Sequence, residues 1–214
     1  NLMDRAIISR TEKEAKEHAI LQNLDTSFQK IDELPFDFER RRMSVIVKDD
    51  SNVVSMVTKG ALEEMLNIST HVEYRGEVIP LTEDIRQEVL AEVGQLNRQG
   101  LRVLGVGYKS GLREDYAYTV TDESDMILTG YLAFLDPPKP SAAPAIQALL
   151  EHGVRTKILT GDNEKVTQAI CEKVGLDVEH ILLGADIDQM TDQELADVVE
   201  KVTVFAKLSP DQKA

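Results

Sequence analysis

Apolar and polar residues follow each other in short runs along the first part of the chain. The stretch "MSVIVKDDSNVVSMVTKG", residues 43–60, holds two β-rich runs around an Asp-Asp-Ser-Asn turn, a pattern typical of a β-hairpin. Residues 101–106 and 127–134 are further apolar runs of strand length. We therefore expect a mainly antiparallel sheet in this part of the chain.

Helical periodicity marks two segments beside these strands. In residues 82–98 the apolar side chains recur on one stripe, formed by Ile85, Val89, Val93 and Leu96. Gly100 follows as a stop signal. Residues 11–24, "TEKEAKEHAILQNL", are rich in charge and predict a helix on the surface. Helices are thus expected to flank the antiparallel sheet.

After "LDPPKP" the rhythm changes to alternating helices and strands. The pattern predicts helices at 142–152, 164–174 and 192–199 and strands at 154–160, 180–184 and 202–207. Thr191 and Glu194 form a capping-box pattern before the last of these helices. Such alternation is typical of parallel strands with helical crossovers. We interpret the chain as a mixed α/β (α+β) protein, with one domain at residues 1–130 and a second at 131–214.

Composition narrows the classes of protein that remain. The chain has 214 residues with a formal net charge of -14, and its sequence pI is near 4.7. A nucleic-acid-binding surface is excluded on this basis, because phosphate backbones are bound through basic stripes. No apolar run approaches the length of a membrane span, so we expect a chain that does not contact membrane. The single Cys171 excludes an internal disulfide and a multi-cysteine metal site. This cysteine usage suits a reducing compartment and indicates a cytosolic chain.

Positive charge nevertheless gathers beside aromatic rings in "FDFERRRMS", residues 36–44. A guanidinium offers a planar fork of donors suited to phosphate oxygens, and a phenylalanine ring offers a flat face to a base. The phenylalanines and arginines of this stretch are therefore candidates for binding a nucleotide. The alternative is that Phe36 and Phe38 are core residues and that the arginines balance an acidic surface.

Two further stretches in this part carry candidate anion-binding residues. In "TKGA", residues 58–61, Lys59 can reach an anion and Gly60 lets backbone approach closely, although an ordinary strand-to-helix turn has the same composition. In "GLRVLGVGYK", residues 100–109, Arg102 stands among apolar neighbours, so its charge needs a partner or a ligand. The glycines of this stretch do not make a dinucleotide-binding loop, because the third glycine and the following helix are missing.

The second part has polar residues after its predicted strands. Thr160 and Asp162 lie in "ILTGDN", where a strand ends and a helix begins. Asp136 in "DPPKP" and Lys213 in "SPDQK" follow other strands. Open α/β sheets bind ligands at this edge, so we expect these four side chains to lie near one another. Each stretch taken alone is also compatible with a plain loop.

The ordered set "FDFERRRMS", "TKGA", "GLRVLGVGYK", "DPPKP", "TGDN" and "SPDQK" resembles the cytoplasmic nucleotide-binding domain and adjoining phosphorylation domain of P-type cation-transporting ATPases. The resemblance covers almost the whole chain. The stretch "KIDELPFDFERRRMSVIV" is similar in particular to bacterial magnesium-transporting members. The implied fold is an antiparallel sheet with flanking helices, followed by an incomplete parallel haloacid dehalogenase-like segment.

The resemblance also implies roles for individual residues. Phe36 would stack on adenine, Lys59 would line the adenine-ribose pocket, and Arg102 would contact a phosphate. Arg41 stands where the family keeps a basic residue near the nucleotide, and Asp4 where many members have an acidic one. In the second part Thr160 and Lys213 match motifs of the phosphotransferase core, and the resemblance makes Asp136 and Asp162 hinge and site carboxylates.

Two family motifs do not occur in this sequence. The Asp-Lys-Thr-Gly-Thr motif with the phosphorylated aspartate is missing, and so is the Gly-Asp-Gly-x-Asn-Asp motif that helps to bind magnesium. We therefore expect a piece of a longer pump that binds ATP or ADP, holds no metal ligand of its own and is inactive alone. A stand-alone phosphatase of the haloacid dehalogenase-like class and a noncatalytic acidic interaction domain are the alternatives.

In the intact pump, the resemblance implies ATP and Mg²⁺ as cofactors. The terminal phosphate would pass to an aspartate outside this chain, and the aspartyl phosphate would drive cation transport, with magnesium as the expected ion. The partners would be the transmembrane, actuator and remaining phosphorylation parts of the pump. The expected location is the cytoplasmic side of an integral membrane protein in a bacterial inner membrane.

Overall fold

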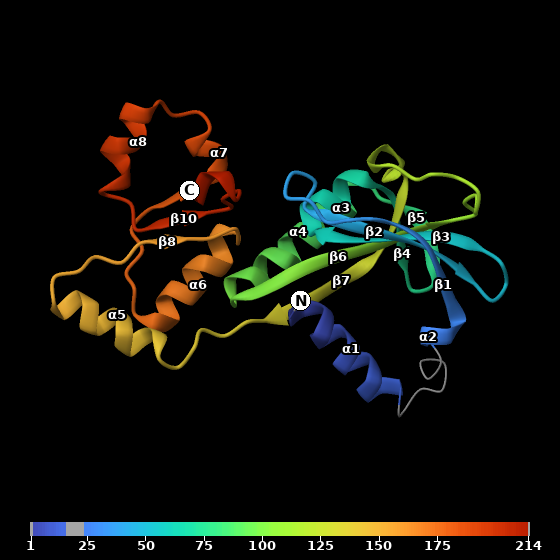
Figure 1. The fold of residues 1–214 in the computed structure, drawn as a ribbon, viewed down its shortest axis with the longest axis horizontal. Coiled ribbons are helices and arrows are strands. Elements are labelled where there is room, and N and C mark those ends of the chain that lie inside the picture. Colours follow the sequence, from blue (N-terminus) through green and yellow to red (C-terminus); the bar gives the residue numbers. More distant parts are fainter. Residues whose placement is uncertain (1, 16–23, 214) are drawn as a thin grey trace. The chain divides into compact units, whose positions relative to one another are not determined.

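The computed structural model describes residues 2–15 and 24–213, which form two compact units (Figure 1). The first unit contains residues 1–86 and 104–134, and the second contains residues 87–103 and 135–214. The chain therefore passes from the first unit to the second and back before it finally enters the second. The domain boundary near residue 130 stays a prediction.

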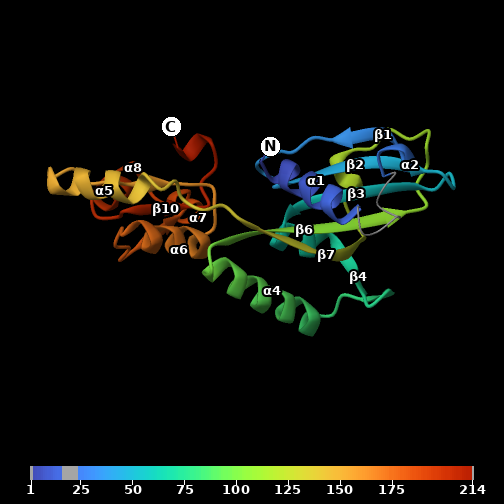
Figure 2. The same cartoon turned by 90° about the horizontal axis from the view of Figure 1, so that it is seen from below.

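A seven-stranded sheet organises the first unit, with the strand order β1-β2-β3-β6-β7-β4-β5. In Figure 2 the labels β1, β2, β3, β6, β7 and β4 follow one another in this order. Its strands are β1 (Phe28–Leu34), β2 (Arg42–Asp49), β3 (Val54–Ala61), β4 (Ser69–Tyr74), β5 (Glu77–Pro80), β6 (Leu101–Ser110) and β7 (Met126–Leu135). Four neighbouring pairs run antiparallel, namely β1 with β2, β2 with β3, β3 with β6 and β4 with β5. The predicted, mainly antiparallel sheet is confirmed, and the parallel pair of β4 and β7 is an addition to it.

The predicted hairpin corresponds to β2 and β3, in which Arg42 lies opposite Gly60 and Lys48 opposite Val54. Its turn depends on the Asp49 carboxylate, which accepts hydrogen bonds from the backbone amides of Ser51 and Val53, both at 2.9 Å. A side chain that caps backbone donors in this way favours a tight turn. The turn signal in the sequence therefore has a local physical basis.

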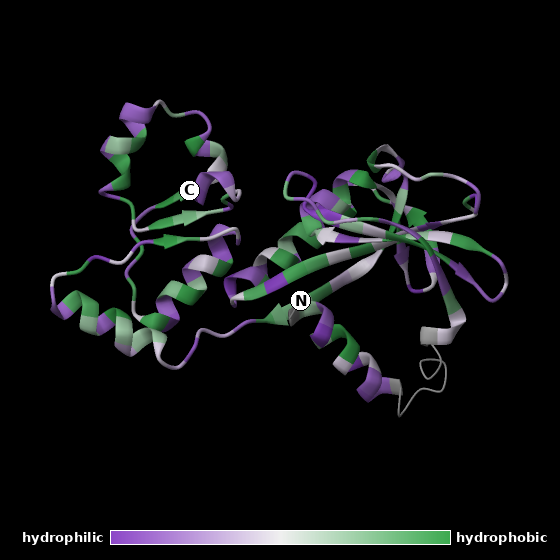
Figure 3. Ribbon diagram, in the orientation of Figure 1, coloured by the Kyte–Doolittle hydropathy of each residue, from purple (hydrophilic) through white to green (hydrophobic). Residues whose placement is uncertain are grey.

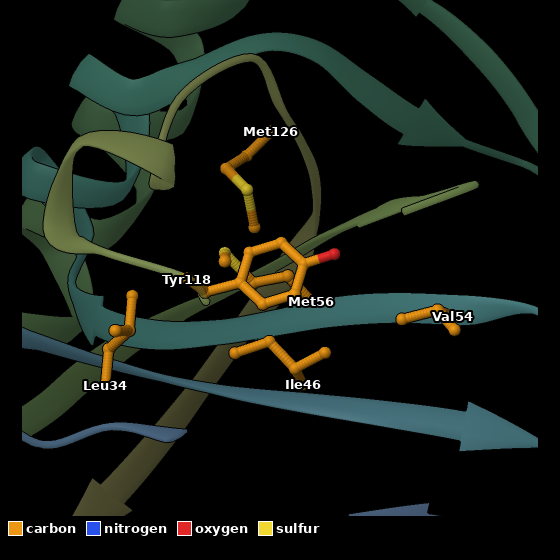
Figure 4. Packing of buried hydrophobic residues seen from close by; sticks show 6 residues of the cluster. All are labelled: Leu34, Ile46, Val54, Met56, Tyr118 and Met126. Carbon is orange, nitrogen blue, oxygen red and sulfur yellow. The ribbon is translucent and has the colours of Figure 1, made fainter. Parts of the chain in front are cut away.

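The core of the first unit lies on one face of the sheet. Alternate residues of β3 are buried, as expected for a strand with one face turned inward. The main cluster of buried side chains, shown in Figure 4, consists of Leu34, Ile46, Val54, Met56, Tyr118 and Met126. Gly105 in β6 lacks a side chain because an added Cβ would lie 2.9 Å from Met65 of the short helix α3 (Leu62–Ile68).

The remaining helices of the first unit are α1 (Leu2–Ala15), α2 (Leu24–Ser27) and the 3₁₀ turn η2 (Val120–Asp122), and α4 (Glu83–Arg98) begins in the first unit and continues in the second. The predicted helix at 82–98 is confirmed by α4 almost to its bounds. Of the helix predicted at 11–24, α1 covers the first five residues, residue 24 begins α2, and residues 16–23 lie outside the described residues. The helix thus begins nine positions earlier than the charge pattern indicated.

A three-stranded parallel sheet in the order β8-β10-β9 organises the second unit. Its strands are β8 (Ile158–Leu159), β9 (Ile181–Leu183) and β10 (Val204–Ala206), and they are mostly hydrophobic (Figure 3). Parallel pairing was expected from the alternation of helices and strands. The predicted strand at 154–160 is reduced to two residues, because β8 lies at the edge of the sheet and pairs with β10 only at Ile158 and Leu159.

Besides most of α4, the helices of the second unit are α5 (Ala142–Glu151), α6 (Glu164–Val174), α7 (Gly184–Ile187), α8 (Asp192–Val199) and the 3₁₀ turn η3 (Asp211–Lys213). The predicted bounds of α6 and α8 are confirmed. Local caps explain this agreement: Asn163 accepts a hydrogen bond from the Val166 amide, and Thr191 and Glu194 form the predicted capping box. No helix among the described residues is long and apolar enough to cross a membrane.

Candidate functional site

Two phenylalanine rings project from the loop that precedes β2 in the first unit. Phe36 is 51% exposed and Phe38 is 63% exposed, so neither belongs to the hydrophobic core. Their ring centroids lie 5.3 Å apart in an edge-to-face arrangement, with an interplanar angle of 85°. Exposed aromatic area of this size is costly in water, and it can stack on a flat ligand such as a base.

The same loop lies beside the end of β3. The Arg41 backbone amide donates to the Asp37 carbonyl at 3.0 Å, and the Arg41 carbonyl accepts from the Ala61 amide at 3.0 Å. Arg41 has a φ of 50°, a left-handed conformation that is uncommon for a residue with a side chain. These contacts bring the loop with Phe36 and Arg41 to the strand end that carries Lys59 and Gly60.

The other two arginines of the "RRR" run have a buried partner, Glu123. Its carboxylate is fully buried and accepts from Arg40 Nη1 at 2.5 Å and from Arg42 Nε at 2.7 Å through the same oxygen, Oε2. Its other oxygen accepts from Ser44 Oγ at 2.7 Å, and Ser44 contacts Thr58 Oγ1 at 2.7 Å. We call Arg40, Arg42, Ser44, Thr58 and Glu123 the Glu123 cluster.

The Glu123 cluster determines the charge state of its carboxylate. Burial acts to raise the pKa of Glu123, but the hydrogen bonds from Arg40, Ser44 and Arg42 outweigh it and hold that pKa below its ordinary value of 4.5. Sequence reasoning missed Glu123, because in "TDESDM" it is surrounded by polar residues typical of a solvated loop. Charge balance therefore does explain two of the three arginines, with a buried partner instead of a surface one.

Lys59 forms an ion pair with Asp4 from α1. The Lys59 side chain is 29% exposed and the Asp4 side chain 41% exposed, so the pair is still reached by solvent. In the sheet, Lys59 lies opposite Met43 of β2 on one side and opposite Val106 of β6 on the other. The structure thus brings together two of the predicted binding residues, and it places a carboxylate on the lysine expected to bind an anion.

Gly60 has a structural reason for its lack of a side chain. An added Cβ would lie 2.5 Å from the Arg42 Cβ and 2.7 Å from the Arg41 carbonyl oxygen. Real Cβ atoms do not approach other atoms so closely. Close backbone approach was predicted for Gly60, and here the approaching backbone is that of β2 and the loop before it.

In the second unit, Arg102 lies between two carboxylates. Its Nη1 is 3.2 Å from Asp136 Oδ2 and its Nη2 is 2.8 Å from Asp162 Oδ2. The Thr160 hydroxyl also donates to Asp162 Oδ2 at 3.1 Å. Four predicted site residues therefore meet within one unit, and Arg102 has the partners that its apolar surroundings required. Its Nε is buried and has no hydrogen-bond acceptor among the described residues.

Lys213 lies in η3, after β10, and its side chain is exposed. A Cβ placed on Gly161 would be 3.8 Å from Lys213 Nζ, so the ammonium lies beside the loop that contains Thr160 and Asp162. That loop is also tied to the segment after β10, because the Leu208 amide donates to the Thr160 carbonyl at 3.0 Å. The ends of the parallel strands thus bring these residues to one edge.

These arrangements fit a nucleotide in part. In the first unit, the exposed Phe36 ring can stack on a base. The partly exposed Lys59 ammonium and the Arg41 guanidinium carry positive charge that can bind phosphates. In the second unit, Arg102 pairs with Asp136 and Asp162, and its buried Nε has no acceptor among the described residues. Among the described residues, no group of three or more His, Cys, Asp or Glu side chains is arranged to hold a metal ion.

A polar hollow occurs elsewhere in the first unit, at the other end of β2. It is lined by residues of α2, β1, the end of β2 and the β2–β3 turn, among them Phe28, Lys48 and Asp49. None of the residues that the sequence singled out for ligand binding lines it. We therefore centre the candidate site on Phe36 and Lys59.

Comparison with known proteins adds a family and several relatives. The family model described as "P-type ATPase, cytoplasmic domain N" matches residues 1–141. "Magnesium-transporting ATPase, P-type 1" of Salmonella typhimurium is 46% identical over 213 residues, and that of Escherichia coli K12 is 45% identical. "Calcium-transporting ATPase 1" of Bacillus cereus is 32% identical over 196 residues, which cover 89% of this chain and 21% of that protein. The alignments cover all of this chain but only 23% of the length of the magnesium-transporting relatives.

Proposed function

Because this chain belongs to the family of P-type ATPase cytoplasmic N domains, we propose that it binds ATP for a pump that transports cations. The pump would couple ATP hydrolysis to transport through an aspartyl phosphate formed outside this sequence, in which the Asp-Lys-Thr-Gly-Thr motif does not occur. Magnesium is the proposed ion, since relatives named as magnesium-transporting ATPases are 45–46% identical over the whole chain. The chain alone would bind nucleotide without hydrolysing it.

One observation carries the proposal of nucleotide binding: Phe36 presents a half-exposed ring on a loop that is hydrogen-bonded to the end of the strand bearing Lys59. The ring would stack on adenine, and the Lys59 ammonium would lie beside the ribose and phosphates. Arg41 would add positive charge near the nucleotide. Gly60, whose missing side chain admits the backbone of Arg41 and Arg42, would keep the loop of Phe36 close to Lys59. Asp4 would accept a hydrogen bond from the base.

The residues around Arg102, in the second unit, would act on phosphate groups. Arg102 would contact a phosphate oxygen, with Asp136 as a hinge carboxylate. Thr160, Asp162 and Lys213 would belong to the phosphotransferase site, which needs the phosphorylated aspartate from the rest of the pump to be complete. Mg²⁺ would accompany ATP in the intact enzyme and supply positive charge to its phosphates, with ligands mostly outside this chain.

The proposed setting follows from the family. The chain would lie on the cytoplasmic side of a bacterial inner membrane as part of an integral membrane protein. Its partners would be the transmembrane, actuator and remaining phosphorylation parts of the pump. Residues 1–130 would form the nucleotide-binding domain and residues 131–214 a partial phosphorylation domain of the haloacid dehalogenase-like type.

Titration of the chain with ATP, followed by amide chemical shifts, tests the proposal. We expect shifts clustered at Phe36, Lys59 and neighbouring residues, with a Kd between roughly tens of micromolar and millimolar, because a shallow half-exposed site leaves a small surplus over the cost of association. Shifts confined to other surfaces, or no shifts at millimolar ATP, would contradict nucleotide binding and favour a noncatalytic interaction domain.

A further inference from the structure

We propose that Glu123 is a positioning residue for nucleotide binding: its buried carboxylate holds Arg40, and Arg40 bonds to the residues on both sides of Phe36, namely to the Pro35 carbonyl and to the Asp37 carboxylate. The inference rests on the proposed function only in assigning the base-stacking role to Phe36. Glu123 would not touch the nucleotide. It would determine where the ring stands before the nucleotide arrives.

The Arg40 guanidinium bonds to both chain neighbours of Phe36. Its Nη2 donates to the Pro35 carbonyl at 2.7 Å, and its Nε pairs with the Asp37 carboxylate. Pro35 and Asp37 are the two chain neighbours of Phe36, so one guanidinium is bonded to the residue before the ring and to the residue after it. The Arg40 amide also donates to Asp37 Oδ1 at 2.7 Å, which closes the loop on itself.

Glu123 holds the third nitrogen of the Arg40 guanidinium. This nitrogen, Nη1, donates to Glu123 Oε2 at 2.5 Å, and the Arg40 side chain is only 15% exposed. Charge-assisted hydrogen bonds of this kind are shorter and stronger than neutral ones. The planar guanidinium uses all three nitrogens at once, so its orientation is determined by Pro35, Asp37 and Glu123 together.

The two chain neighbours of Glu123, Asp122 and Ser124, are themselves held by hydrogen bonds. Asp122 forms a capping box with Thr119, whose amide donates to Asp122 Oδ2 at 2.7 Å. The Lys109 ammonium from β6 donates to the carbonyls of Asp122 and Ser124, the two neighbours of Glu123. The backbone on both sides of Glu123 is therefore fixed by hydrogen bonds to Lys109 of β6, and this determines where its carboxylate lies.

Neutralising the charges of Arg40 and Arg42 does not by itself require a buried carboxylate. Surface ion pairs would neutralise Arg40 and Arg42 at little cost, whereas burying a carboxylate is expensive unless every oxygen is paired. Here both oxygens are paired, and the partners lead to the loop with Phe36. A ring whose loop is already ordered loses less conformational entropy on binding, which raises affinity without a new contact.

Nucleotide titrations of two variants test the inference. Glu123→Gln replaces one acceptor oxygen by a donor, so it cannot accept from Ser44 and both arginines together. We expect it to weaken AMP, ADP and ATP by a similar factor of about ten, since the effect acts through the base. Glu114→Gln is the matched control, because Glu114 is 56% exposed and pairs with Lys48 away from the loop; it should bind as the wild type does.

A double variant separates positioning from general loss of structure. In a Phe36→Ala background Glu123→Gln should weaken binding no further, because no ring remains to be positioned. Equal losses in both backgrounds would overturn the proposal. Arg40→Lys provides the same test without altering the buried carboxylate, since a lysine keeps the charge but has no planar fork to bond Pro35, Asp37 and Glu123 at once.

Amide hydrogen exchange, measured without nucleotide, tests whether Glu123 orders the loop that contains Phe36. The Arg40 and Arg41 amides, both bonded to Asp37, should exchange at least ten times faster in Glu123→Gln, while the Val45 amide in β2 stays as protected as in the wild type. Unchanged protection at Arg40 and Arg41 would overturn the proposal. If the wild type bound no nucleotide, the proposed function would fail, and exchange alone would show whether Glu123 orders this loop.

Discussion

The Lys59 ammonium of β3 pairs with the Asp4 carboxylate of α1 across 55 positions of sequence. The pair joins two residues that the family resemblance assigns to the same nucleotide. An anionic ligand that approaches Lys59 therefore meets a carboxylate already in place. In the proposed function, Asp4 and a phosphate would compete for one ammonium, so the affinity for nucleotides would depend on the charge at position 4.

Asp4→Asn should strengthen ATP binding. The substitution keeps an acceptor oxygen for the base and removes the charge that competes for Lys59. A half-exposed ion pair is worth about 0.2–1 kcal/mol, so we expect a gain of up to about five-fold for ATP and less for AMP. Calorimetric titration at low salt measures it. A loss of ATP affinity in the folded variant would mean that the Asp4 charge itself helps to bind nucleotide.

Phe36→Ala should weaken ATP, ADP and AMP by similar factors. Stacking of a base on an aromatic ring contributes about 1–3 kcal/mol and does not depend on the number of phosphates. Phe28→Ala is the control, because Phe28 is 47% exposed and lies on β1 away from the candidate site. Titration of the three nucleotides against both variants checks this. Wild-type affinity in Phe36→Ala would remove the stacking role.

Arg102→Ala should weaken ATP and ADP more than AMP. A charge-assisted hydrogen bond to a phosphate contributes on the order of 1.5–3 kcal/mol, reduced where solvent screens it. The difference between ATP and AMP should shrink as salt is raised, whereas the Phe36→Ala effect should not. Arg155→Ala, which removes an exposed arginine paired with Glu200, is the control. Equal losses for all three nucleotides would argue against a phosphate contact by Arg102.

Gly60→Ala should destabilise the chain, because its Cβ would lie 2.5 Å from the Arg42 Cβ. Overpacking of this kind costs about 1–3 kcal/mol. Gly94→Ala tests the opposite case: in α4 the new methyl would meet only the ends of flexible side chains, with Lys165 Nζ at 3.3 Å, and should stabilise by about 0.5–1 kcal/mol. Urea unfolding measures both. A neutral Gly60→Ala would show that β2 and β3 can move apart.

The Glu123 cluster should make stability depend on pH in the acid range. A carboxylate whose folded pKa is lowered contributes stability that is complete above its ordinary pKa of 4.5 and is lost as pH falls through the lower, folded value. At pH 7 we expect Glu123→Gln to cost about 1–3 kcal/mol, because buried donors lose their acceptor. The difference from the wild type should narrow below pH 4.5 in urea unfolding. A difference independent of pH would show that the charge of Glu123 is unimportant.

Local sequence patterns predicted the elements whose ends depend on their own residues. The helices α6 and α8 begin at the side-chain caps Asn163 and Thr191. The β2–β3 hairpin turns at Asp49, whose side chain bonds to amides only two and four residues away. Such interactions lie within a few positions along the chain, so they can be read before the fold is known.

The short strands β4 and β5 were not predicted, because they carry few apolar side chains and depend on distant partners. β4 pairs in parallel with β7, more than fifty positions later in the sequence, and β5 pairs only with β4 at the edge of the sheet. The predicted strand at 154–160 shrank to β8 for a related reason, since only two of its residues find a neighbour in β10.

The candidate site divides in the same way. Residue types alone selected Phe36, Lys59 and Arg102, because an aromatic ring beside arginines and a lone arginine among apolar residues are visible in the sequence. Only the tertiary structure decided what these residues contact: Asp4 for Lys59, Asp136 and Asp162 for Arg102, and Glu123 for two of the three consecutive arginines. A charge in the sequence indicates that a partner is needed, but which one it meets depends on strands and loops that pack together from distant parts of the chain.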